Sequence, residues 1–296
     1  MVTRGRLRAA VLPALAGLAL SAISCTAPGV AAAARTRALG QTACPVTRSF
    51  GSLPLFAHVT NADDVMVASN GNVWVSNVGD HQVTELSPAG TVVHVFTDNQ
   101  NPEGMVQLSS STMALANQES DQVVVFNTTT GHSKLWVQLT PNGNLGVDGI
   151  GVEPGMLLLP DAAQGNLDTV PLPPFSGGPV TVATGLGRPV DATPVGDGTL
   201  LVSVENPPGL DRVNPATGAV TPAAHFSSTD DVVVRNGIAY VADIGGGTMS
   251  AVTLSSGMVN TLVTGIKDAQ GLAMRADGTF LVVDESSGDI RVATGC

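Results

Sequence analysis

Short apolar runs recur from about residue 53 to the end of the chain, each bounded by Gly, Pro, Asn or Asp. Their length and their Val-rich composition are typical of strands, and no long amphipathic helix is predicted after the N-terminus. Four runs form one unit, and six units follow one another at a period of about forty residues, which is typical of a β-propeller. The second run of each unit shows the repeat best, at residues 72–77, 112–117, 156–161, 199–203, 239–243 and 279–284.

The last unit is incomplete, because the chain ends after its third run at residues 289–294. A spare strand lies before the first unit, at residues 53–59. We therefore predict an all-β fold, a six-bladed propeller with four-stranded blades. The N-terminal strand completes the last blade and closes the ring, which leaves no long exposed sheet edge.

The first 37 residues differ from the rest of the chain. A basic start with three arginines precedes an apolar run at residues 9–23 and an alanine-rich stretch at 30–34. This order predicts a secretory signal peptide and flexible segment at 1–37, with the propeller at 38–296 and a secreted or cell-envelope location. Two alternatives keep the protein at a membrane: an uncleaved N-terminal anchor, or lipidation of Cys25, which follows the apolar run.

Two further cysteines, Cys44 and Cys296, stand near the two ends of the predicted propeller. Because closure of the ring brings these ends together, we expect a disulfide, as suits an exported chain. Five of the 13 basic residues lie within 1–37, which leaves eight against 24 acidic residues in the remainder. So acidic a surface repels phosphate backbones, and nucleic-acid binding is not expected.

Acidic residues recur where the first strand of each unit begins. In a propeller these strands line the central channel, so the six positions form a ring at its mouth. Crowded carboxylates repel one another unless a cation lies among them, and hard oxygen ligands favour Ca²⁺. The sequence thus predicts a divalent-cation site, although each acid could instead accept backbone hydrogen bonds and order a turn. The six residues are Asp63, Glu103, Asp148, Asp191, Asp230 and Gln270, of which the five acids are the candidate metal ligands.

Candidate catalytic residues are fewer. Asp230 and Asp231 form a doublet in which one carboxylate is expected to remain free to act as a base, and His81 is a second possible base on the same face. The second strands end in another polar set, for which ordering of the following loop is the leading interpretation. That set consists of Asn77, Asn117, Asp161, Asp243 and Asp284.

The repeat resembles the NHL and virginiamycin B lyase type of propeller, most clearly at residues 63–77 and 270–284. It is also similar to the wider superfamily of gluconolactonase (senescence marker protein) and strictosidine-synthase-like propellers. In the lactonase branch a divalent cation at the top of the channel is held by Glu, Asn and Asp side chains. By position, the resemblance carries that role to Glu103, Asp148, Asp191 and Asp230, with Asp63. Residues 284–288 stand where a lyase of this type has catalytic histidines.

Two functions from different classes remain open. The first is a metal-dependent hydrolase of lactones or related esters, with a small-molecule substrate at the channel mouth. The second is a non-catalytic propeller that binds a ligand or a protein, and short loops above the ring favour it. A natural-product lyase or cyclase is a third. A monomer is expected, because the ring closes on itself.

Overall fold

The computed structural model describes residues 44–98, 100–140, 146–173 and 177–296. The predicted signal peptide and Cys25 lie outside these residues. Within them, no helix is long and apolar enough to cross a membrane.

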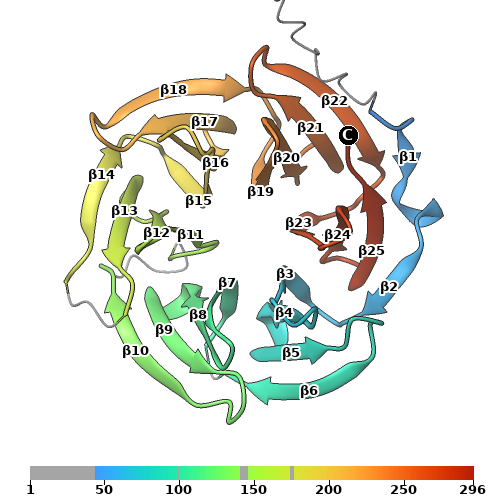
Figure 1. The fold of residues 1–296 in the computed structure, drawn as a ribbon, viewed down its shortest axis with the longest axis horizontal. Coiled ribbons are helices and arrows are strands. Elements are labelled where there is room, and N and C mark those ends of the chain that lie inside the picture. The colour runs from blue at the N-terminus through green and yellow to red at the C-terminus, as the bar shows by residue number, and fades with distance from the viewer. Residues whose placement is uncertain (1–43, 99, 141–145, 174–176) are drawn as a thin grey trace, which may run out of the picture. The chain divides into compact units, whose positions relative to one another are not determined.

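Six sheets are arranged around a central axis, and the innermost strand of each faces that axis (Figure 1). The blades are numbered here in chain order. Blade one contains β3 (Ala62–Val67), β4 (Val73–Asn77), β5 (Gln82–Leu86) and β6 (Val92–Thr97). Blade two contains β7 (Pro102–Ser109), β8 (Thr112–Asn117), β9 (Gln122–Asn127) and β10 (Ser133–Gln138). Blade three contains β11 (Gly151–Glu153), β12 (Met156–Asp161), β13 (Asn166–Pro171) and β14 (Val180–Thr184).

The other three blades follow the same antiparallel order. Blade four contains β15 (Arg188–Pro194), β16 (Leu200–Asn206), β17 (Gly209–Asn214) and β18 (Ala219–Ala224). Blade five contains β19 (Thr229–Arg235), β20 (Ile238–Asp243), β21 (Thr248–Thr253) and β22 (Met258–Thr264). Blade six contains β23 (Ala269–Met274), β24 (Thr279–Asp284), β25 (Asp289–Thr294) and β2 (Leu55–His58). Short 3₁₀ turns occur at η1 (Phe50–Ser52), η2 (Val78–Asp80) and η3 (Gln118–Ser120). The predicted six-bladed fold is confirmed.

Apolar packing between neighbouring blades holds the ring together. The second strand of each blade is buried along nearly its whole length, which explains why its sequence is apolar at consecutive positions. Six clusters of buried side chains result, one at each seam between blades. At the seam of blades one and two, for example, Trp74 and Phe126 pack edge to face at 6.2 Å between ring centroids.

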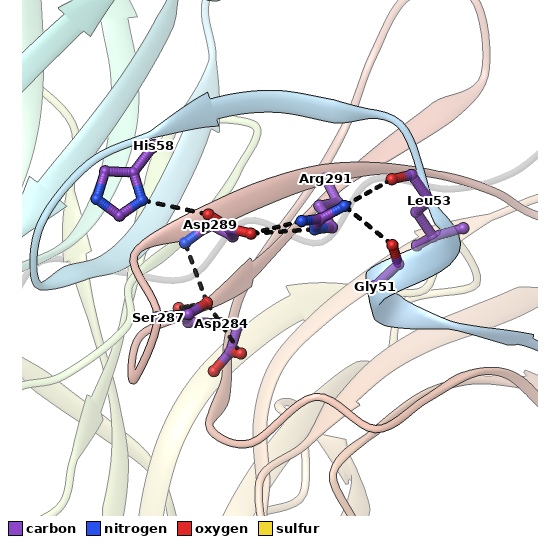
Figure 2. A network of polar contacts seen from close by, with 7 residues as sticks. All are labelled: Gly51, Leu53, His58, Asp284, Ser287, Asp289 and Arg291. Atoms are coloured by element: carbon purple, nitrogen blue, oxygen red, sulfur yellow. Dashed lines mark hydrogen bonds and ion pairs between the residues drawn. The ribbon is translucent and has the colours of Figure 1, made fainter.

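The ring is closed as predicted, by β2 pairing with β25. Figure 2 shows the polar contacts that fix this strand. The Arg291 guanidinium donates to the Leu53 carbonyl at 2.8 Å and to Asp289 Oδ2 at 2.6 Å, and His58 Nδ1 lies 3.2 Å from Asp289 Oδ1. Arg291 also lies over the ring of Phe50, 5.3 Å from its centroid. One arginine of the third strand thus binds both its own strand and the closing segment.

A second device fastens the two ends of the propeller. Cys44 and Cys296 form the expected disulfide, which spans 252 residues of sequence. The hydroxyl of Tyr240 donates to the Cys296 carbonyl at 3.2 Å and accepts the Cys296 N–H at 3.1 Å. The sequence pattern did not predict β1 (Arg48–Ser49), which adds a parallel fifth strand beside β22 of blade five.

Candidate functional site

The innermost strands carry a β-bulge close to the point where they begin. In blades one, two, five and six the register shifts across the residues that precede Val65, Met105, Val232 and Leu272. A bulge sets two consecutive residues opposite one, so both can be redirected toward the axis. Aligned on the ends of the second strands, the first bulge position holds Asp63, Glu103, Asp148, Val190, Asp230 and Gln270. The second bulge position holds Asp64, Gly104, Gly149, Asp191, Asp231 and Gly271.

The structure gathers the four acids of the first position into one electrostatic group. Asp63, Glu103, Asp148 and Asp230 are all buried. Burial raises the pKa of Glu103 well above its usual range, and the charges of Asp63 and Asp148 raise it further. Burial likewise raises the pKa of Asp230, with Asp148 and Asp63 the largest charge contributions. A hydrogen bond joins the carboxyl groups of Asp63 and Glu103. These four residues, predicted as metal ligands, therefore lie together at the channel.

The second bulge position has a different task, which is to join one blade to the next. Asp191 Oδ2 accepts the Val232 N–H at 3.0 Å, and Asp231 Oδ2 accepts the Leu272 N–H at 2.6 Å. In each case an aspartate of one blade binds the backbone that follows the bulge of the next blade. Asp64 accepts a hydrogen bond from the equivalent residue of blade two in the same way.

Where this position holds glycine, the next blade approaches too closely for a side chain. A Cβ atom at Gly104 would lie 2.6 Å from Gly149 Cα, and one at Gly271 would lie 2.6 Å from the Asp63 carbonyl oxygen. At Gly149 it would meet the Val190 carbonyl oxygen at 2.7 Å. At this position neighbouring blades are thus joined in one of two ways. An aspartate hydrogen-bonds to the backbone of the next blade, and a glycine allows the two backbones to come into direct contact.

This arrangement divides the predicted site residues. Asp191 belongs to the second position, one residue beyond the place that the sequence alignment gave it. Burial raises its pKa to about 7, the Val232 N–H opposes the rise, and the charge of Asp64 adds to it. Of the predicted doublet, Asp231 is occupied by the Leu272 N–H and by a hydrogen bond with Asp64, so Asp230 is the carboxyl left for chemistry. A metal or catalytic role for these residues stays a prediction.

Sequence reasoning missed Arg188, the one basic side chain at the first-position acids in the described part of the chain. Its guanidinium lies 3.3 Å from Asp148 Oδ2 and forms an ion pair with Glu205. Gln118 Nε2 also donates to Asp148 Oδ2, at 2.9 Å. Burial raises the pKa of Asp148 to about 6, because the attraction of Arg188 offsets only part of the desolvation. The signal in the sequence was an arginine at the start of the one first strand whose first bulge position is apolar, Val190.

The polar residues that end the second strands bind two kinds of loop. As the leading interpretation expected, Asp161 and Asp284 bind the loop that follows: Asp161 Oδ1 accepts the Gln164 N–H at 3.0 Å, and Asp284 Oδ2 accepts from Ser287 Oγ at 3.0 Å. Other contacts hold the segment that precedes the first strand of the same blade. Asn77 Nδ2 donates to the Thr60 carbonyl at 2.9 Å. Asp243 Oδ1 accepts the N–H groups of Ser227 and Ser228, and Asp284 Oδ1 accepts the Asp268 N–H.

His81 lies on a different part of the blade from the first-position acids. It follows η2 with a left-handed backbone, φ 52°, and its side chain is exposed. Its carbonyl accepts the Asp98 N–H at 2.8 Å, and Asp98 follows β6, the outermost strand of blade one. A catalytic role for His81 stays a prediction.

The first-position acids fit a hard divalent cation by the chemistry of their donors, since all are carboxyl oxygens whose ionised forms repel one another. In the structure, however, Asp63 and Glu103 are hydrogen-bonded to each other. Among the described residues, no group of three or more His, Cys, Asp or Glu side chains is arranged to hold a metal ion. Binding would therefore require rotation of side chains such as Asp63 and Glu103 out of their mutual hydrogen bond.

Comparison with known proteins identifies the fold. No family model and no curated protein matches the sequence. Among solved structures, a gluconolactonase of Xanthomonas campestris superposes with a TM-score of 0.69 at 13% identity, covering 87% of this chain and 99% of that one. A calcium-binding regucalcin of Agrobacterium tumefaciens gives 0.65 at 15% identity, covering 82% and 97%. Virginiamycin B lyase of Staphylococcus aureus gives 0.61 at 15% identity, covering 79% and 80%. The chain has the six-bladed propeller fold that these proteins share.

Proposed function

We propose that this protein is an exported, metal-dependent hydrolase of lactones or related esters, with its active site at the first-position acids. The observation that carries the proposal is the burial of Asp63, Glu103, Asp148 and Asp230 within range of one another's charges. Burying four acids in one place destabilises the folded protein unless a bound cation offsets the cost. Such clusters are therefore typical of functional sites. The fold shared with a gluconolactonase and a calcium-binding regucalcin supports the same choice.

Each residue has a defined task in this proposal. Asp63, Glu103 and Asp230 would hold a calcium-like cation, which supplies Lewis-acid polarisation of a carbonyl oxygen when bound. Asp230 is the candidate base: it would take a proton from the water that attacks the carbonyl carbon, and burial, by raising its pKa, makes it a stronger proton acceptor than an exposed carboxylate. Arg188 and Gln118 orient Asp148 by binding the same carboxyl oxygen.

Export is part of the proposal. The disulfide between Cys44 and Cys296 is compatible with an oxidising compartment. The basic and apolar order of residues 1–37 supports a signal peptide that delivers the chain there.

Hydrolysis of a panel of lactones and esters tests the proposal, with each substrate assayed in calcium and in chelator. Glu103→Gln and Asp230→Asn are expected to abolish calcium-dependent turnover. Asp80→Asn is the matched control, because it also removes one carboxylate but at an exposed loop position of blade one. No turnover of any panel member by the calcium-loaded protein, or equal turnover by all variants, would overturn the hydrolase.

A non-catalytic binding propeller is the second candidate. It is favoured by the ion pair of Arg188 with Asp148, which already neutralises one of the four acids. A protein that binds calcium at the channel but hydrolyses nothing in the panel would support this function instead.

A further inference from the structure

A second polar site lies away from the channel, at the seam between blades one and two. A cavity of about 410 Å³ opens there, and Asp98, Gln100 and Asn117 are among the residues that line it. We call it the seam cavity and define it by these three residues together with Val124 and Ser133, which also line it.

Two oxygen atoms of the seam cavity have no hydrogen-bond partner in the part of the chain that the structure describes. Asn117 is 2% exposed, and its Oδ1 has no partner within the described residues; nor has the buried Oε1 of Gln100. A buried oxygen that lost its water on folding and gained no donor destabilises the protein, so an orphaned acceptor calls for a ligand or a water.

Comparison of blades one and two shows why the Asn117 oxygen is unpaired. In blade one the equivalent residue, Asn77, is fully satisfied: its Nδ2 donates to the Thr60 carbonyl, and its Oδ1 accepts from Thr84 Oγ1 at 3.0 Å. Asn77 and Asn117 each end the second strand and pair with Gln82 and Gln122. Two residues after these glutamines stands Thr84 in blade one but Val124 in blade two. Valine has no hydroxyl, so Asn117 does not have the donor that Asn77 has.

The third oxygen-bearing side chain adds a negative charge. Asp98 is 7% exposed; its Oδ1 accepts the Gln100 N–H at 3.2 Å and its Oδ2 accepts from Ser133 Oγ at 3.4 Å. These are long, weak contacts that leave lone pairs available on the carboxylate. One carboxylate and two amide oxygens are acceptors only, so they require a ligand that brings positive charge or donors.

We propose that the seam cavity binds a divalent cation of the size of Ca²⁺ through Asp98, Gln100 and Asn117, independently of the channel. Carboxylate and amide oxygens are the ligands such an ion prefers. One carboxylate gives a weak site, with an expected Kd of about 10⁻⁴ to 10⁻³ M, the range of extracellular calcium modules.

The test is calcium titration by calorimetry and by melting temperature at constant ionic strength, in a Glu103→Gln/Asp230→Asn background that disables the channel. A calcium-dependent rise of melting temperature is expected to persist in this background. Asp98→Asn is expected to weaken the remaining calcium binding at least tenfold.

Val124→Thr is the decisive variant, because it restores the donor that blade one has. It is expected to raise the melting temperature without calcium by about 2–4 °C and to weaken calcium binding at least tenfold. Thr84→Val is its mirror control: it orphans Asn77 and lowers the melting temperature, but it creates no calcium response, because no carboxylate corresponds to Asp98 in blade one.

Two results would overturn the proposal. The first is no calcium effect on the channel-disabled protein, in which case Val124→Thr merely replaces a buried water. The second is a calcium effect that survives both Asp98→Asn and Val124→Thr. Since Glu103 and Asp230 are replaced in this test, it stands or falls separately from the proposed hydrolase.

Discussion

Replacing Asp191 by asparagine tests whether the second bulge position is structural. The substitution removes a buried charge but keeps an oxygen that can accept the Val232 N–H. Burial, with the charge of Asp64 adding to it, raises the pKa of Asp191 to about 7, against an ordinary value of 3.8. The folded protein therefore binds the proton more tightly than the unfolded chain between these two pH values.

The sign of the effect follows directly. For a raised folded-state pKa, the stabilising contribution is fully present below about pH 4 and is lost as the pH rises through about 7. A difference of about three units between the folded and unfolded pKa corresponds to roughly 4 kcal/mol of unfolding free energy. This is an upper bound, because the neighbouring acids titrate together with Asp191. Without divalent cations, Asp191→Asn is thus expected to be more stable than the natural protein by roughly 2–4 kcal/mol at pH 8 and within about 1 kcal/mol of it at pH 4.

The assay is urea unfolding in chelator from pH 4 to 8, followed by the fluorescence of Trp74 and Trp136. Asp80→Asn serves as the control for charge removal at an exposed site and should show no such trend. An Asp191→Asn variant that is less stable at pH 8, or whose stability difference does not change with pH, would refute the reasoning.

Three further predictions concern the seams and the closure. Gly271→Ala is expected to lower the unfolding free energy, measured in urea, by about 1–3 kcal/mol, because the added Cβ overpacks against the next blade. Gly51→Ala should change it little, because no atom lies within 4 Å of the added Cβ. Equal losses in the two variants would contradict the close approach. Reduction, or a double Cys44→Ser/Cys296→Ser variant, is expected to lower the unfolding free energy by up to about 5 kcal/mol, and an unchanged urea midpoint would show that the strand alone closes the ring. Arg291→Gln is expected to lose about 2–3 kcal/mol and to increase hydrogen exchange in the closing strand; exchange that stays as in the natural protein would remove its role in closure.

The fold could be predicted because every seam repeats the same constraint. Consecutive apolar positions in the second strands, such as those before Asn77 and Asp284, predicted strands at a regular period, and the incomplete last unit predicted that the N-terminal strand completes it. The ring closure and the disulfide followed from that topology, not from any local signal at Cys44 or Cys296.

The candidate site was only partly predictable, because a bulge breaks the alternation on which sequence patterns rely. Asp191 shares its spacing with the first-position acids but lies at the second position, since blade four has Val190 before it. An aspartate and a glycine look unrelated in sequence, yet Asp231 and Gly271 occupy the same bulge position and each joins its blade to the next. Arg188 was missed because its partners are distant from it in sequence: Glu205 lies on the neighbouring strand of the same blade, and Asp148 comes from the preceding blade.

Calcium binding by the mature propeller is the most direct measurement of the central claim, that the first-position acids form a cation site. The account predicts one tight, stoichiometric calcium ion at pH 8, retained in Asp80→Asn and lost in Glu103→Gln/Asp230→Asn. The rise in melting temperature at low calcium is expected to be lost with it, while the weaker response of the seam cavity remains. Identical isotherms for the natural protein and the Glu103→Gln/Asp230→Asn variant would contradict it.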